Sequence, residues 1–413
     1  MQVNEKDLPI SKHTQSVHWY LLVLLLFAVV LGSYQRGEMS ILLLMIREEL
    51  KLSVIDLGYV LASFGLASTA GFLLMAVFVW REKYWAGYAV LGIFGVLGAL
   101  LTGVSSGTGG LIVARGITGL AYGGLLVGAY RIISGWLPPE SHGLATGLLF
   151  AATQSMRPLT PVITESVIHV GWRRYSLGVA GLWFLWVLLW IWLLRRSRDT
   201  LRREQPRNLV TVAQMFKDRV TWIVVVSAAL ASPLLAFQSG RFLAYELELL
   251  KAGGPPAAWK FLLVDLLPAM GVVAAGFISD TLICKGWSAV NSRTVLVAIC
   301  GLLMSFTAVF AFSRSPVFSL LFAMLSVTAG ESLFSLLYAA LVDALPGRGI
   351  ILGVGFIGWL GGVMAYVTNI MTEPLTSRFG SGPLVIGFSI LTLAAIICVR
   401  RLARKMSGEI ANS

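Results

Sequence analysis

Residues 17–46, VHWYLLVLLLFAVVLGSYQRGEMSILLLMI, form an apolar run long enough to cross a lipid bilayer, yet its second half carries Arg36 and Glu38. A bilayer-spanning helix needs about twenty mainly apolar residues. A charged side chain inside such a span costs roughly 2.5–3.5 kcal/mol, so intramembrane arginines usually face a bundle interior or a water-filled pathway. We therefore expect Arg36 to bind an anion. The alternative is that Arg36 pairs with a neighbouring helix and serves packing alone.

The composition of the whole chain is that of a polytopic membrane protein. Of 413 residues, 57% are hydrophobic and 13% are charged, whereas about a quarter of the residues in a soluble protein are charged. The net charge is +12, but the basic residues gather in short loops beside the apolar runs, where they set membrane orientation. We therefore expect a lipid bilayer, and no nucleic acid, around this chain.

Twelve apolar runs separated by short polar breaks predict an all-α membrane protein with twelve transmembrane helices. Backbone inside lipid must satisfy its own hydrogen bonds, so each run is expected to be helical. The predicted spans cover residues 17–46, 54–80, 84–104, 111–138, 143–168, 175–194, 220–250, 261–283, 294–312, 316–345, 349–373 and 383–399.

A basic segment divides these spans six and six. Residues 195–219 contain eight Lys/Arg and are the predicted linker between two six-helix bundles, residues 1–194 and 220–413. On this division 19 of the 32 Lys/Arg lie on the linker's side of the membrane, 8 on the other side and 5 inside spans. The positive-inside rule places the linker and both termini in the cytoplasm. We expect a multi-pass protein of a bacterial-type cytoplasmic (inner) membrane.

Two arginines occupy matching places in the two halves. Arg36 lies 19 residues into the first span, and Arg241 lies 21 residues into the seventh. Transporters built from parallel repeats place the substrate site near the bilayer midplane, between the repeats. The planar guanidinium donates two parallel hydrogen bonds to a carboxylate or phosphate and keeps its charge. The pair is therefore expected to hold a small anionic solute.

Several segments resemble the major facilitator superfamily. Residues 115–124, RGITGLAYGG, are similar to its RxxxG-type signature. GFISD at 276–280, followed by KGW at 285–287, is similar to its signature loop between the second and third helices of a half. In the first half this loop is degenerate, with Ala76 and Trp80 at the glycine and acid positions. The resemblance covers nearly the whole chain and implies a two-bundle carrier that works by alternating access.

Within that superfamily the chain resembles the anion:cation symporters of hexuronates, galactonate and related carboxylates. Residues 32–53 are similar to their first span and residues 129–147 to the stretch joining their fourth and fifth spans. The chain also resembles the organophosphate:phosphate antiporters, which implies that Arg36 and Arg241 clamp one anionic head group. Gln35 and Tyr122 stand where the symporters usually carry proton-binding acids, so the usual route of proton coupling is in question.

Further polar residues in the spans are candidates for the substrate site. Arg115 and Arg157 are expected to shape a positive pocket, and hydroxyl or amide groups in the spans are expected to bind a hydroxylated substrate. Each of these is alternatively an interhelical contact. The candidates that complete the predicted site are Tyr34, Tyr59, Tyr122, Tyr338 and Asn369.

Acidic residues in the spans divide into two groups. Glu38 and Glu331 are the proton-coupling candidates, because a carboxyl group in apolar surroundings can take up and release a proton near neutral pH. Glu38 points about 200° away from Arg36 around the helix. Glu331 is alternatively the neutralising partner of an arginine such as Arg241. At the cytoplasmic span ends, Asp280 and Asp343 are predicted conformational latches beside Lys285 and Arg348.

These features together predict a secondary active transporter of a small organic anion, a sugar acid or other carboxylate. We expect ion or proton coupling, a monomer, no cofactor and no metal, and no enzyme activity. The three cysteines lack metal-ligand spacing, and no nucleophile–base pair or phosphate-binding glycine loop stands out. The alternatives are an organophosphate or anion exchanger without proton coupling, a transporter-like membrane sensor, and an exporter of amphipathic compounds.

Overall fold

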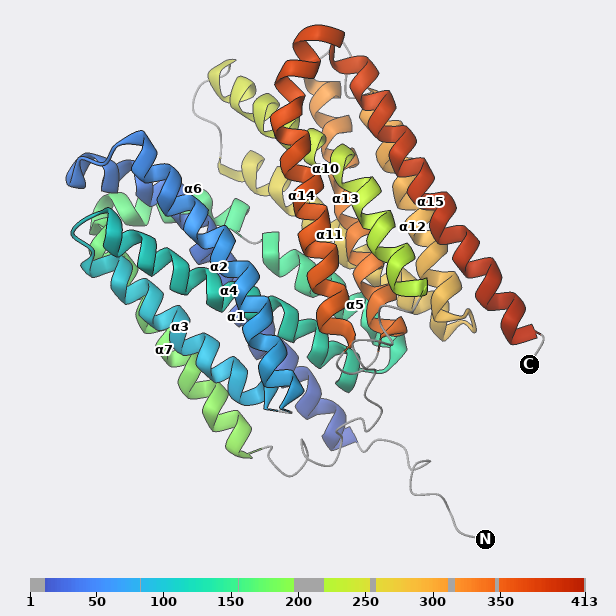
Figure 1. Ribbon diagram of the computed structural model, residues 1–413, viewed down its shortest axis with the longest axis horizontal. Coiled ribbons are helices and arrows are strands. Elements are labelled where there is room, and N and C mark those ends of the chain that lie inside the picture. The colour runs from blue at the N-terminus through green and yellow to red at the C-terminus, as the bar shows by residue number, and fades with distance from the viewer. Residues whose placement is uncertain are drawn as a thin grey trace.

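The computed structural model describes residues 12–81, 83–154, 156–196, 219–252, 258–310, 316–345 and 349–411. Short stretches within these ranges, 156–162 and 240–265 among them, lie outside the described side chains. The described residues form thirteen helices. Their order and placement are shown in Figure 1.

The first seven helices precede the basic segment. They are α1 (Lys12–Leu50), α2 (Val54–Trp80), α3 (Tyr84–Val104), α4 (Thr108–Trp136), α5 (Pro139–Gln154), α6 (Met156–Val170) and α7 (Trp172–Arg196). The remaining six follow that segment. They are α10 (Arg219–Ala252), α11 (Ala258–Cys284), α12 (Ala289–Phe310), α13 (Pro316–Ala344), α14 (Gly349–Phe379) and α15 (Ser381–Ala411).

Eleven helices in the described part of the chain are long and apolar enough to cross a membrane. They correspond to the predicted spans with one exception. The fifth predicted span, 143–168, coincides with α5 and α6, which lie on either side of residue 155, and that residue is outside the described part of the chain.

Local sequence signals begin and end several helices. Ser53 and Asp56 form a capping box at the start of α2, in which each side chain accepts a hydrogen bond from the other residue's backbone N–H. Gly171 after α6 and Gly380 after α14 adopt positive φ angles of 82° and 77°. Glycine takes this left-handed conformation without steric cost, so the chain can turn directly into the next helix.

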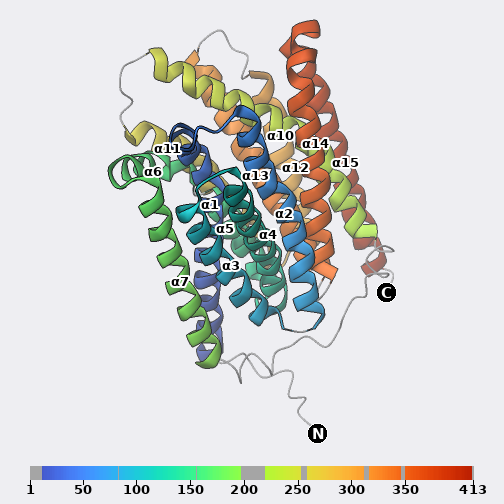
Figure 2. The same ribbon diagram turned by 60° about the vertical axis from the view of Figure 1, so that its left-hand side comes forward.

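The helices before and after the basic segment form two groups, except that α5 of the first lies against the second, as Figure 1 shows; Figure 2 shows the same arrangement turned by 60°. Helices α4 and α5 connect the groups, since α5 packs on α11 and α13 while α4 touches α13 and α14. The division into bundles 1–194 and 220–413 stays a prediction, and most of the linker 195–219 lies outside the described residues.

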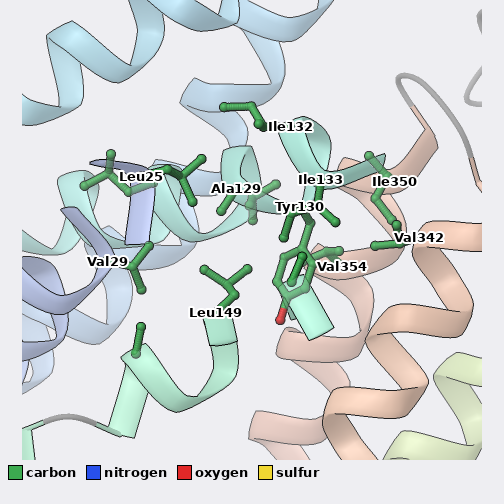
Figure 3. Packing of buried hydrophobic residues seen from close by; sticks show 14 of the residues in the cluster. Leu25, Val29, Ala129, Tyr130, Ile132, Ile133, Leu149, Val342, Ile350 and Val354 are labelled. Carbon is green, nitrogen blue, oxygen red and sulfur yellow. The ribbon is translucent and has the colours of Figure 1, made fainter. Parts of the chain in front are cut away.

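One apolar cluster runs across the contact between the two groups. Tyr130 of α4 and Leu149 of α5 share it with Val342 of α13 and Val354 of α14 (Figure 3). Within the first group, α3 and α7 approach closely around a row of tryptophans. A Cβ atom on Gly95 would lie 2.6 Å from the ring of Trp183, so the missing side chain makes room for the indole.

Candidate functional site

Arg36 presents its guanidinium group on an exposed face of α1, although the residue lies inside the apolar run. Its Nη1 donates a hydrogen bond of 3.4 Å to the hydroxyl of Tyr122 on α4. The guanidinium carbon also lies 5.8 Å from the centre of that ring. Arg36 and Tyr122, both predicted site residues, are therefore neighbours. A single long hydrogen bond leaves most of the five N–H donors of Arg36 available to a ligand.

Arg115 is buried and turned to the backbone of α1. Its Nη1 donates to the carbonyl of Gln35 at 2.7 Å, and its Nη2 donates to the carbonyl of Arg36 at 3.3 Å. The guanidinium carbon lies 4.4 Å from the centre of the Phe64 ring. Arg115 thus fixes the segment of α1 that carries Arg36. Its expected place in the substrate pocket stays a prediction.

Gln35 is buried and bridges three helices. Its side-chain oxygen accepts a hydrogen bond from Trp183 of α7 at 2.8 Å, and its amide donates to the carbonyl of Gly95 on α3 at 3.3 Å. Trp183 was not among the predicted functional residues. Gln35 and Arg115 together hold α1 against α3, α4 and α7.

Tyrosines gather where the two helix groups meet. Tyr130 of α4 stacks on Tyr338 of α13, with ring centres 4.9 Å apart and planes inclined by 19°. Phe150 of α5 lies 6.3 Å from the Tyr338 ring. Tyr122 lies on the same helix as Tyr130, about two turns before it. The contact between Arg36 and Tyr122 therefore lies further along the helix that reaches the junction of the two groups.

The other two tyrosine candidates in the first group lie elsewhere. Tyr34 of α1 packs against Tyr175 of α7, with ring centres 6.2 Å apart. Tyr59 of α2 is 61% exposed. The structure does not bring either residue to the stacked pair of Tyr130 and Tyr338 by any contact among the described residues.

The two coupling candidates have different surroundings. Glu331 of α13 is buried, and its Oε1 accepts a hydrogen bond from Gln154 at the end of α5. Glu38 of α1 is 4% exposed, and its Oε2 has no hydrogen-bond partner among the described residues. Arg115 is the cation that attracts Glu38. Gln154, which sequence reasoning missed, bonds to Glu331 across the junction of the two groups.

Asp280 holds α11 to the start of α5. Its two carboxylate oxygens accept hydrogen bonds from the backbone N–H groups of Gly143 at 3.0 Å and Leu144 at 2.6 Å. Oδ1 also forms an ion pair of 2.7 Å with Arg293 of α12. Through this one carboxylate, α11 is joined to both α5 and α12.

Asp343 makes the second connection. It pairs with Arg293 at 3.1 Å and with His142 of α5 at 2.6 Å. Arg293 additionally donates to the carbonyl of Pro139 at 3.0 Å. The side chain of the predicted partner Lys285 is exposed, and its role as a latch stays a prediction. Among the described residues, Arg293 and His142 are the cationic or basic partners of Asp280 and Asp343. We call Asp280, Arg293, Asp343 and His142 the gate network.

Four predicted residues cannot be placed. Arg348 lies outside the described residues. Arg241, Arg157 and Asn369 lie in described helices, but their side chains are outside the described set. The proximity of Arg36 and Arg241 therefore stays a prediction.

A comparison with known protein families shows which family this chain belongs to. Residues 20–366 match the family model described as Major Facilitator Superfamily. The chain belongs to the Major Facilitator Superfamily. It is 20% identical over 435 residues to the hexuronate transporter of Escherichia coli (strain K12), covering 96% of each chain. It is 22% identical to the D-galactonate transporter of Escherichia coli O6:H1, covering 94% of this chain and 96% of the relative.

A partial match and two solved structures agree with this membership. The galacturonate transporter of Dickeya chrysanthemi is 24% identical over 242 residues, 53% of this chain and 69% of the relative. The proton:xylose symporter XylE superimposes with a TM-score of 0.71 at 14% identity, covering 94% of this chain and 96% of that one. The structure of FucP in the outward conformation superimposes with a TM-score of 0.64 at 13% identity. The match covers 94% of this chain and 99% of FucP. These structures support the twelve-helix fold.

Proposed function

We propose that this member of the Major Facilitator Superfamily is a secondary active transporter that moves a small organic anion of the sugar-acid class by alternating access. The observation that carries the proposal is the exposed guanidinium group of Arg36, placed inside a membrane span beside Tyr122 of the helix that reaches the junction of the two helix groups. A charged arginine inside a membrane span is costly, and a carboxylate ligand would offset that cost.

The class of anion follows from the chemistry of the neighbouring side chains. A sugar acid joins one carboxylate to several hydroxyl groups. Arg36 suits the carboxylate, while tyrosine hydroxyls both donate and accept hydrogen bonds and suit the hydroxyl groups. The hexuronate, galacturonate and D-galactonate transporters named above support this choice. We further propose that Arg241, from the matching helix of the second half, is the second cationic contact.

The orientation completes the proposal. With the linker and both termini in the cytoplasm of a bacterial-type inner membrane, the gate network lies at the cytoplasmic ends of α5, α11, α12 and α13. Because this network joins the two helix groups, the arrangement corresponds to a closed cytoplasmic side. An anion would then enter from the outer side to reach Arg36.

For coupling, we propose Glu38 as the proton-binding acid. Its side chain is buried, and its Oε2 has no hydrogen-bond partner among the described residues. Glu331 is the weaker candidate, because Gln154 binds it. Replacing each acid by Gln and measuring uptake driven by a pH gradient tests the choice. We expect Glu38→Gln to abolish the pH dependence and Glu331→Gln to retain it.

The function is tested by ligand binding to the purified full chain. A thermal-shift panel of glucuronate, galacturonate, galactonate, simple carboxylates, amino acids and phosphate esters should show stabilisation by the sugar acids, since a native-state ligand raises apparent stability. Arg36→Lys should weaken that binding by roughly tenfold or more, because lysine cannot make the bidentate contact. Arg47→Lys, an exposed change on the same helix, should leave it unchanged. Equal affinity of wild type and Arg36→Lys would refute the site.

Uptake into liposomes separates the alternatives. Accumulation driven by an imposed pH gradient supports symport, whereas uptake that requires phosphate inside the vesicles indicates an exchanger. Tight binding without flux indicates a sensor. Stabilisation by amphipathic compounds alone would point to an exporter of such compounds.

A further inference from the structure

His142 contacts hydrogen-bond acceptors through both of its ring nitrogens. Nδ1 lies 2.6 Å from Oδ1 of Asp343, and Nε2 lies 2.7 Å from the backbone carbonyl oxygen of Leu137. A carbonyl oxygen can only accept, and so can an ionised carboxylate, whereas a neutral imidazole has only one N–H donor. Both contacts can be hydrogen bonds only when the pair holds one proton more than a neutral His142 beside an ionised Asp343.

The net charge of the gate network also favours binding of this additional proton. Arg293 pairs with both Asp280 and Asp343, so two carboxylates face one guanidinium group. The His142 side chain is 6% exposed and that of Asp343 is 10% exposed. An uncompensated charge at this depth is costly. A proton on His142 makes the four-residue network electrically neutral.

Among the described side chains, other charged groups on the helices around α5 do not provide this compensation. Glu140 on α5 and Lys285 after α11 are exposed, and the Arg131 guanidinium of α4 lies 5.3 Å from the centre of the Tyr84 ring. Glu331 of α13 bonds to Gln154 at the far end of α5, and Arg36 and Glu38 of α1 lie in the segment bound by Arg115.

We propose that His142 and Asp343 form a proton-binding site at the cytoplasmic gate, assembled only when the two helix groups meet there. His142 comes from α5 and Asp343 from α13, so separating the groups removes the carboxylate from the imidazole. The closed gate then binds the proton more tightly than the open gate. Acid in the cytoplasm favours closure, and a rise in pH favours opening.

This site is separate from transport coupling. It lies at the cytoplasmic end of the helices, so it exchanges its proton with that compartment and carries none across the membrane. The inference uses the cytoplasmic orientation of the proposed function, but neither the substrate nor the role of Glu38 enters it. Its effect is to make gate opening depend on pH on one side of the membrane.

The size of the effect follows from one bound proton. Because the closed gate holds one proton more than the open gate, the ratio of closed to open molecules should fall as the pH rises. One proton limits this change to about tenfold per pH unit.

The experiment measures gate distance without substrate. Nitroxide labels replace the exposed Arg81 and Lys285 on a cysteine-free full chain, and double electron–electron resonance records their distances from pH 5.5 to 8.5. We expect a short distance at low pH and a growing long component as pH rises. His142→Arg, a permanent cation, should keep the short distance throughout. His142→Gln should remove the pH dependence.

A matched control and two outcomes decide the proposal. His169→Gln changes an exposed histidine at the other end of the first bundle and should retain the wild-type profile. A wild-type distribution that is constant over this pH range overturns the proposal. An unchanged pH profile in His142→Gln overturns it too. Because no substrate is present, failure here is distinguishable from failure of the proposed transport activity, which is read by ligand binding and uptake.

Discussion

Trp183 donates its indole N–H to the side-chain oxygen of Gln35 over 2.8 Å, while the Gln35 amide donates to the carbonyl of Gly95. The first contact needs an acceptor and the second needs a donor, and an amide supplies both. An ionised carboxylate would place two acceptors against each other at Gly95. The glutamine at a position where related symporters usually carry an acid is thus part of the packing of α1, α3 and α7.

Removing the Gln35 side chain should destabilise the first helix group. Gln35→Ala leaves the buried Trp183 N–H without its acceptor, which costs about 1–3 kcal/mol. Thermal unfolding in detergent measures the loss. Trp183→Phe and the double variant complete a mutant cycle, and we expect the double variant to be less destabilised than the sum of the single changes. Strict additivity would show that the hydrogen bond carries no energy.

Arg115 and Arg36 should respond differently to the same substitution. Arg115→Lys loses at least one of two charge-assisted hydrogen bonds to the backbone of α1, so stability should fall by about 1.5–3 kcal/mol. Anion binding should fall with it, since Arg115 fixes the segment that carries Arg36. Arg36→Lys should reduce binding while leaving the unfolding temperature nearly unchanged. Measuring both quantities on both variants checks the assignment, which a full-strength binding signal in a destabilised Arg115→Lys would contradict.

The helices were largely predictable from the sequence because lipid imposes strong conditions on them. A run of about twenty apolar residues in a bilayer must be helical, and the predicted bounds 84–104 and 54–80 coincide with α3 and α2. The fifth predicted span, 143–168, is covered by α5 and α6 on either side of residue 155, which lies outside the described residues, so its continuity stays a prediction.

The sequence identified several residues of the site, but it did not show which of them contact one another. Arg36 and Tyr122 were both identified, yet 86 positions separate them, and only the fold shows that they touch. Arg293 was missed because it lies at the end of a span, where it was counted as an orientation signal. His142 was missed because a lone histidine beside two prolines has no pattern. Its partner Asp343 lies 201 positions away.

A pH-dependent contact at the C-terminal end of α1 gives a further prediction. Glu49 accepts hydrogen bonds from the Trp172 indole at 2.6 Å and from Arg173 at 3.1 Å. These contacts, the Trp172 bond most of all, hold the pKa of Glu49 below its ordinary value of 4.5. The ionised form is thus favoured in the folded chain. The stabilisation is present above the ordinary pKa and is lost as the pH falls through the lowered one.

The measurement is the unfolding temperature of wild type and Glu49→Gln between pH 7 and pH 3. Wild type should be more stable at pH 7, and the difference should shrink once the pH falls below about 4.5. Glu48→Gln, a change of the exposed neighbouring residue, is the matched control and should follow wild type throughout. A constant difference between wild type and Glu49→Gln across the range would exclude this contact as its source.

The close approach of α5 and α11 predicts a variant that opens the gate. A Cβ atom on Gly276 would overlap the carbonyl oxygen of Gly143, and one on Gly143 would lie 2.6 Å from Oδ1 of Asp280. Gly276→Ala must therefore push the two backbones apart. That movement lengthens the hydrogen bonds from Gly143 and Leu144 to Asp280. Overpacking of this kind costs about 1–3 kcal/mol in the closed state alone.

A free-energy cost that applies only to the closed state shifts the equilibrium toward the open state. The ratio of open to closed molecules should rise by roughly fivefold to 150-fold. Labels at positions 81 and 285 should report the long distance in Gly276→Ala at a pH where wild type shows the short one. Gly355→Ala, on α14, is the matched control, because a Cβ atom there meets no atom within 4 Å. Its distances should equal those of wild type. If Gly276→Ala also keeps the short distance, the helices part elsewhere and α5 and α11 do not form the gate.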